Sequence, residues 1–292
     1  FEGTTTLRVS AMAESTGSVS QTGDCFVVLG NGSQALLLNS NAEINMTGCN
    51  VNVNSTNNTA VMINSNSHIE ASSVCIGGDY RANGSGYISP NPTTDCAPMA
   101  DPYADLEGPD VGNCDYYNNN FNHGTHTISP GVYCGSFNLN SNSTVVMDPG
   151  VYIFKTSVNV NSNATLEGEN VMMYFTENGR LTLNSNSTLD ITPMETGPYA
   201  GILLFQDQDY GNGHYHILNS NTNIGYDGLI YFPNATLTMN SNTNIAMNSS
   251  CTQIVVGKAI LNSNIEIDFT PNYSECDHVT SEITSASVRL IQ

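Results

Sequence analysis

The amino-acid sequence predicts an all-β fold: a single right-handed parallel β-helix (β-solenoid) with coils of about 22 residues and ladders of stacked asparagines. Three observations support this prediction. A tripeptide recurs at intervals of about one coil, apolar residues alternate on both sides of it, and neighbouring cysteines are separated by similar intervals. Together they indicate a chain wound repeatedly around one hydrophobic core.

The tripeptide Asn-Ser-Asn occurs eight times, and five of its seven successive spacings fall between 21 and 25 residues. A repeat of this length suits one rung of a solenoid and is too short for a βαβ unit, which needs about 30 residues. The motifs begin at Asn39, Asn64, Asn140, Asn161, Asn184, Asn219, Asn240 and Asn262.

Apolar residues flank every motif. The residue before it and the third residue after it are apolar in all eight cases, as in Leu38 and Ile44 around the first motif. Alternation of this kind has a period of two, which is typical of strands. A disordered Asn/Ser-rich linker would not keep these positions in register. Each coil is therefore predicted to be a strand, an Asn-Ser-Asn bend, a second strand and a variable return.

Asparagine suits the bend for two reasons. It tolerates the left-handed backbone region better than most residues. Because stacked coils lie about 4.8 Å apart, identical asparagine side chains can also hydrogen-bond from coil to coil as a ladder.

The whole chain, 1–292, is predicted to be one solenoid domain. Coils occupy 33–269, with a loop insertion at about 89–127, and the segments without the motif, 1–32 and 270–292, are candidate caps. A second extra loop is expected at 207–214, where the spacing between motifs lengthens.

The charge balance excludes two classes of partner. Lys and Arg total 6 against 26 Asp and Glu, and the formal net charge is −20. Nucleic acid and an anionic membrane surface both need a basic footprint, so neither is an expected partner. No apolar run approaches the roughly 20 residues that span a bilayer.

The eight cysteines lack a CxxC pair, which favours disulfides over zinc and places the chain outside the reducing cytosol. Neighbouring cysteines are separated by 20 to 25 residues, about one coil, so their Cα atoms could stack within disulfide range. Spacing alone leaves other connectivities open. The predicted pairs are Cys25–Cys49, Cys75–Cys96, Cys114–Cys134 and Cys251–Cys276.

Several stretches resemble one known family. They are ISPGVYCG (128–135), PGVYI (149–153), GPYAGILLFQD (197–207), GLIYFPNA (228–235), CTQIV (251–255) and VRLIQ (288–292). In this order, they resemble the C-terminal region of TadG-like proteins of the Tad (Flp) pilus-assembly system. The resemblance implies an extracellular or cell-surface role beside a bacterial pilus, with pilus or cell-surface proteins, or further copies of the chain, as partners.

The two loops are the predicted recognition surface, because binding residues concentrate on loops held by a rigid scaffold. The candidate binding residues are the aromatics of the first loop, Tyr103, Tyr116, Tyr117 and Phe121. Calcium is the one candidate cofactor, and a solvated acidic loop is the alternative. Its candidate ligands are Asp101, Asp105, Asp207 and Asp209. His214 and His216 form a weaker candidate metal pair.

No catalytic residue is predicted. Pectin-degrading β-helices use calcium-binding acids beside a basic residue, or paired carboxylates, and the sequence shows neither arrangement. The first hypothesis is therefore a non-enzymatic structural or adhesive module. The alternative is a carbohydrate-binding or carbohydrate-cleaving β-helix. An ice-binding solenoid is less favoured, because the loops would interrupt a flat face.

Overall fold

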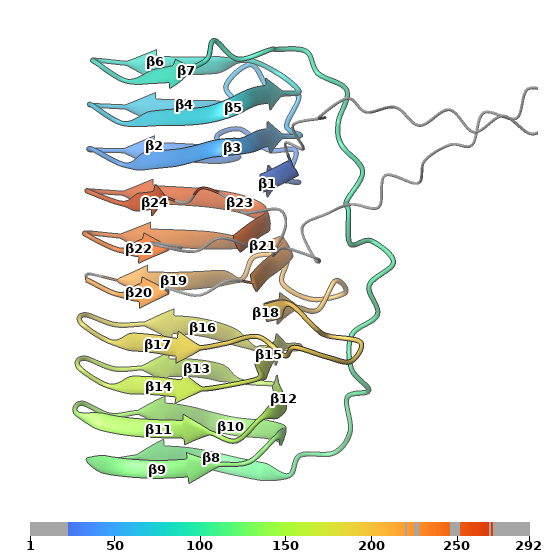
Figure 1. Ribbon diagram of the computed structural model, residues 1–292, viewed down its shortest axis with the longest axis vertical. Helices are drawn as coiled ribbons and strands as arrows, with labels where there is room; N and C mark the ends of the chain where they lie inside the picture. Colours follow the sequence, from blue (N-terminus) through green and yellow to red (C-terminus); the bar gives the residue numbers. More distant parts are fainter. Residues whose placement is uncertain (1–22, 220, 225–227, 246–251, 269, 271–292) are drawn as a thin grey trace, which may run out of the picture.

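A computed structural model describes residues 23–219, 221–224, 228–245, 252–268 and 270. Within these residues the chain is all-β, and its strands pair in parallel as a solenoid of about ten coils, about 23 residues apart (Figure 1). The predicted fold class is confirmed. Each coil contributes strands to three sheets, here called sheets A, B and C.

The strands occupy the following ranges. Sheet A contains β1 (Gly23–Val28), β12 (Gly150–Phe154), β15 (Val171–Phe175) and β18 (Ile202–Gln206). Sheet B contains β2 (Leu36–Asn39), β4 (Val61–Asn64), β6 (Tyr80–Asn83), β13 (Ser157–Val160), β16 (Arg180–Leu183) and β19 (Tyr215–Asn219). Sheet C contains β7 (Tyr87–Ser89), β9 (Gly124–Ile128), β11 (Ser143–Met147), β14 (Thr165–Gly168), β17 (Thr188–Ile191), β20 (Asn223–Ile224), β22 (Asn244–Ile245) and β24 (Glu266–Asp268).

Six longer strands turn a corner between sheets. Those running from sheet A into sheet B are β8 (Tyr116–Phe121), β10 (Gly131–Leu139), β21 (Gly228–Asn240) and β23 (Thr252–Asn262). Those running from sheet C into sheet A are β3 (Glu43–Val53) and β5 (His68–Ile76).

The coils do not stack in chain order (Figure 1). The described chain starts in the middle of the stack with β1–β3 and rises to β6 and β7 at one end. A segment without strands then runs along the side to β8 and β9 at the other end. From there the coils stack back towards the middle, until β23 and β24 pair with β1, β2 and β3.

The meeting of β23 and β24 with β1–β3, here called the junction, joins two parts of the chain that are remote in sequence. Its register is regular: Leu36 lies opposite Ala259, Asn39 opposite Asn262, and Ile44 opposite Ile267. The same three sheets thus continue through the junction without a chain connection.

Two predicted boundaries are wrong. Part of the expected N-terminal cap, 1–32, is β1, which lies mid-stack because its edges are covered by β3 and β23. The last third of the expected loop, 89–127, forms the end coil of β8 and β9. The sequence hid this coil because it lacks Asn-Ser-Asn. Residues 1–22 lie outside the described residues, and so does the C-terminal cap expected at 270–292 apart from residue 270.

Apolar side chains fill the interior and also cover one outer surface. In sheets B and C every second residue points inward. Leu36, Leu38 and Val158 are examples, and all three are fully buried. Sheet A differs, because strands such as β15 and β18 are buried at every position. A second apolar cluster on the outer face of sheet A, which includes Phe205 and Leu229, explains these continuous apolar runs.

The asparagine ladder runs through the whole stack. Nine hydrogen bonds of 2.6–3.4 Å join ten asparagine side chains, and each Nδ2 donates towards the β8–β9 end. The eight motif asparagines occupy the predicted positions, and Asn83 and Asn122 extend the ladder at its two ends. The ladder crosses the junction through Asn39 and Asn262, at 2.8 Å.

The third residue of every motif adopts the left-handed conformation that the bend requires, with φ between 56° and 62°. These residues are Asn41, Asn66, Asn142, Asn163, Asn186, Asn221, Asn242 and Asn264. Several also hydrogen-bond to each other, as in the 2.9 Å bond from Asn41 to Asn264 across the junction.

Replacing a ladder asparagine should destabilise the solenoid according to its position. Asn184→Ala removes two hydrogen bonds. It leaves a donor on Asn219 and an acceptor on Asn161 without their ladder partner. We expect it to lower the free energy of unfolding by about 2–3 kcal/mol in urea titrations. The matched variant Asn83→Ala removes one ladder bond and a weak 3.3 Å hydrogen bond to the Met62 sulfur at an exposed end, and it should cost less than about 1 kcal/mol. Equal losses of stability at both positions would contradict the expected dependence on position in the ladder.

Candidate functional site

The candidate site is built around residues 90–115, here called the strap, which connects the two ends of the solenoid along sheet A (Figure 1). Disulfides anchor it near both ends. Cys75–Cys96 ties it to β5 and Cys114–Cys134 ties it to β10, with Cα separations of 6.0 and 5.9 Å. Thr93 also pairs with Cys75, so the strap leaves the coils as an extra strand segment.

Between its anchors the strap is hydrogen-bonded to several coils. The Asn54 side chain donates to the carbonyl of Met99 and accepts from its amide, both at 2.8 Å. Gln208 donates to the carbonyls of Tyr103 and Leu106 at 3.0 and 3.1 Å.

Strap side chains cover the outer apolar cluster of sheet A. The half-buried Met99, Tyr103 and Leu106 pack against this cluster. A Cβ added at Gly108 would overlap the side chain of Tyr174, so only glycine fits at this position of the strap. The strap therefore packs as a structural element against the solenoid.

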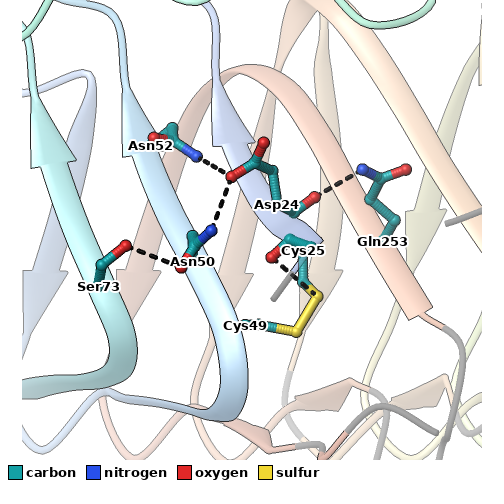
Figure 2. The surroundings of a disulfide bond; sticks show 8 residues. Asp24, Cys25, Cys49, Asn50, Asn52, Ser73 and Gln253 are labelled. Atoms are coloured by element: carbon teal, nitrogen blue, oxygen red, sulfur yellow. Dashed lines mark hydrogen bonds between the residues drawn. A yellow bond between two sulfur atoms is a disulfide. The ribbon is translucent and has the colours of Figure 1, made fainter. Parts of the chain in front are cut away.

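The strap is also connected to the junction. Tyr103 donates from its hydroxyl to Gln253 of β23, and Gln253 donates to the carbonyl of Asp24 in β1 at 2.6 Å. The Asp24 carboxylate accepts from Asn50 and Asn52 of β3 at 3.2 and 2.8 Å, as Figure 2 shows.

The junction network continues beyond Asp24. Ser73 of β5 donates to the Asn50 side chain at 2.8 Å, and the Cys25–Cys49 disulfide links β1 to β3 nearby, with a Cα separation of 5.6 Å (Figure 2). Three of the four predicted disulfide pairs are thus confirmed. Cys251 and Cys276 lie outside the described residues.

The predicted aromatic cluster is divided. Tyr103 belongs to the strap and points towards sheet A, with its ring centroid 5.5 Å from that of Tyr231. Tyr116, Tyr117 and Phe121 belong to β8 in the end coil. Of these three, Tyr117 is the most exposed, at 64%. The prediction of one recognition cluster is wrong, because the strap carries the chain from one end of the stack to the other between Tyr103 and Tyr116.

The predicted acidic residues lie on two segments, the strap and the turn after β18. Both oxygens of Asp101 are engaged, by the Tyr231 hydroxyl at 2.7 Å and the Tyr103 amide at 2.9 Å. Asp207 likewise accepts from the Thr176 hydroxyl at 2.7 Å and the Asp209 amide at 3.0 Å. These carboxylates hold the strap and a turn. Among the described residues, no group of three acidic, His or Cys side chains could hold a metal ion.

An open cleft of about 640 Å³ lies between the strap and the turn after β18. It brings the two predicted acidic segments together, with Asp105 on one side and Asp209 on the other. Tyr174 and Phe205 contribute to its walls.

Burial shifts the pKa values of several side chains around the strap and the core. Burial raises the pKa of Tyr103, and burial together with the bond to Asp101 raises that of Tyr231. Tyr174, which bonds to Asp207, behaves in the same way. These hydroxyls remain protonated donors. Those of Tyr103 and Tyr231 hold the strap to sheet A, and that of Tyr174 holds the turn after β18.

His214 and His216 do not form the predicted metal pair. His216 is fully buried and stacks on Phe232, with ring centroids 3.7 Å apart. Its Nδ1 accepts from the Leu181 amide at 3.2 Å, which leaves Nε2 protonated and able to donate to the side-chain oxygen Oε1 of Gln206 at 2.8 Å. Burial, with smaller contributions from His214 and Arg180, lowers its pKa to about 3.

Sequence reasoning missed the polar residues that hold the strap and the junction, namely Asp24, Asn54, Gln208 and Gln253. Gln253 carried a usable signal, since it is a polar residue directly before the apolar run of β23. The other three lie outside the repeat, and their partners could be identified only from the order of the coils.

Comparisons with family models, curated proteins and solved structures found no match to this chain. The resemblance to TadG-like proteins therefore stays a prediction. The part of the chain that the structure describes contains no helix that could cross a membrane.

Deleting residues 101–113 should prevent native folding, because the shortened strap could no longer span the stack. A loop without this role would tolerate the deletion. Eight strand pairings separate β5 from β10 in sheet A, which is about 38 Å at ~4.8 Å each. The remaining links between Cys96 and Cys114 reach about 17 Å. Non-reducing peptide mapping should show loss of at least one strap disulfide.

The control replaces 101–113 with a Gly/Ser segment of equal length, which keeps the reach and removes the contacts. Both strap disulfides should form, and the melting temperature should fall by about 6–12 °C for a loss of about 3 kcal/mol. A deletion variant with native disulfides and an unchanged melting temperature would show that the strap is dispensable.

His216 should make stability depend on pH. It stays neutral in the folded chain, with a pKa of about 3, while the unfolded chain takes up a proton below about pH 6.5. Stability is therefore lost as the pH falls from 6.5 towards 3. Between pH 7 and 5, the wild type should lose about 2 kcal/mol more than His216→Gln in urea unfolding. Parallel losses in the two proteins would exclude this linkage.

Proposed function

We propose that this chain is a non-enzymatic, extracellular structural module of a surface filament, associated with a bacterial Tad-type pilus. The observation that carries the proposal is the disulfide-anchored strap, which binds both ends of the stack and the junction. A rod of about ten coils, about 45 Å long at ~4.8 Å per coil, is thereby cross-linked as one body. Such a body is suited to bearing load outside the cell.

The use of the unusual ionisable groups supports a structural role. Side chains with strongly shifted pKa values are candidates for catalysis when they line a cleft. Here Tyr103 and Tyr231 hold the strap, and His216 is packed inside the core between Leu181 and Gln206. Their shifts follow from burial in the scaffold. Tyr174 does line the cleft, and its raised pKa follows from burial and from its hydrogen bond to Asp207.

The surface charge favours partners of one kind. The chain carries a net charge of −20, which disfavours acidic partners at low ionic strength and favours basic ones. Pilus or cell-surface proteins with basic faces would fit this chain, and the TadG-like stretches support the same class of partner.

One observation favours carbohydrate binding as a second candidate function. The cleft of about 640 Å³ beside the strap combines the carboxylates of Asp105 and Asp209 with the aromatic walls of Tyr174 and Phe205. Carboxylates that accept from sugar hydroxyls, beside apolar ring surfaces, are common features of carbohydrate sites. The proposal of a structural role places this cleft on the side of the filament.

The proposed function predicts where the protein is found. Immunogold labelling of the intact producing cells, with antibodies against this chain, should decorate surface filaments, and cells lacking its gene should not be labelled. Label confined to the cell interior, or to soluble protein in the medium, would contradict the proposal. Saturable glycan binding that Asp209→Asn abolishes, with no filament label, would favour the second candidate.

A further inference from the structure

The two ends of the solenoid are open edges of parallel sheets. In sheets B and C, β6 pairs with β4 alone and β7 with β5 alone, while β8 and β9 pair only with β10 and β11 among the described residues. Within the described part of the chain, the outer edges of these four strands therefore carry unpaired backbone groups, which are the usual template for strand addition.

We propose that the β6–β7 end of one copy docks onto the β8–β9 end of the next, so that the chain assembles head to tail. The partner is a second copy of this chain. The proposal is independent of the pilus association, since it rests on the geometry of the two ends.

The asparagine ladder makes the ends complementary. Asn83 donates to Asn64, and its Oδ1 accepts from no described residue; Asn122 accepts from Asn140, and its Nδ2 donates to none. One end thus offers an acceptor and the other a donor on the same corner of the solenoid. A bond from Asn122 of one copy to Asn83 of the next would continue the ladder with its direction unchanged.

The same register brings matching side chains together. Ala82 lies in the column of Ile63, and Phe121 lies in the column of Leu139. Docking would place the exposed Ala82 against the half-buried Phe121, a small residue against a large one. Arg81 lies opposite Met62, in the outward-facing column of sheet B, so its charge remains in solvent.

The junction shows that this chain already forms such a contact. There β23 and β24 meet β2 and β3 in sheets B and C, and Asn39 donates to Asn262 at 2.8 Å. Neither sheet needs a chain connection between the two coils. The edges of remote coils are therefore competent to pair by register alone.

The contact is heterologous, because it joins different surfaces of the two copies. Two identical ends would bring like ladder groups together, acceptor to acceptor or donor to donor. A heterologous contact repeated along one axis does not close, and it yields an open filament. Its repeat would be ten coil spacings, about 48 Å at ~4.8 Å per coil.

The purified full chain should form unbranched rods at high concentration, seen by negative-stain electron microscopy and by sedimentation velocity. Ala82→Lys, at an exposed position, should fold normally and raise the concentration needed for assembly by about tenfold or more, because docking would bury an unpaired charge. Thr188→Lys places the same charge on the outward face of β17 and should assemble as the wild type does.

Three outcomes would overturn the inference: a wild type that stays monomeric at all concentrations, a species that stops at a dimer, or an Ala82→Lys variant that assembles normally. Circular dichroism and disulfide mapping of each variant confirm that it is folded. A monomeric chain that still labels surface filaments would remove this inference and leave the proposed function. Rods formed by a chain with no surface label would do the reverse.

Discussion

The structure depends on one constraint, that each coil can satisfy its backbone and cover its apolar interior only by stacking on another coil. The first three coils and the later seven would separately have four open edges. The junction removes two of these edges by pairing β23 and β24 with β1–β3. In doing so it joins Ala259, Leu261 and Ile267 to the core of the N-terminal coils. The stack therefore has one continuous interior and one continuous ladder.

Starting in the middle of the stack has a consequence for the rest of the chain. After β7 the chain must return past the completed coils to reach the opposite end, and the strap is this return. Because the strap crosses sheet A, the outer face of that sheet becomes a second apolar cluster. The apolar runs of β15 and β18 are continuous because both faces of these strands are buried. In sheets B and C one face is solvated, so buried and partly exposed residues alternate.

The local structure of each coil could be predicted because the repeat itself encodes it. Leu38 before a motif and Ile44 after it specify inward positions, and the third asparagine specifies the left-handed bend. The order of the coils could not be predicted, since one Asn-Ser-Asn corner fits any other equally well. The end coil with Asn122 was hidden, because His123 and Gly124 replace the motif there. For the same reason the aromatic residues of the strap and of β8 appeared as one cluster, although Tyr103 lies in the strap and Tyr116 in the end coil.

The residues that distinguish one coil edge from another are those outside the repeat. The ladder would accept Asn262 beneath any coil, whereas Gln253 can meet the Asp24 carbonyl and the Tyr103 hydroxyl only when β23 lies under β1 and the strap lies across both. The Cys25–Cys49 disulfide fixes the coil on the other side of β1. Repeated residues thus supply most of the stability, and a few unique residues select one arrangement among many of similar energy. Among the described residues, no comparable unique residue covers the outer edges of β6, β7, β8 and β9 in sheets B and C, so the repeat there could pair with another copy.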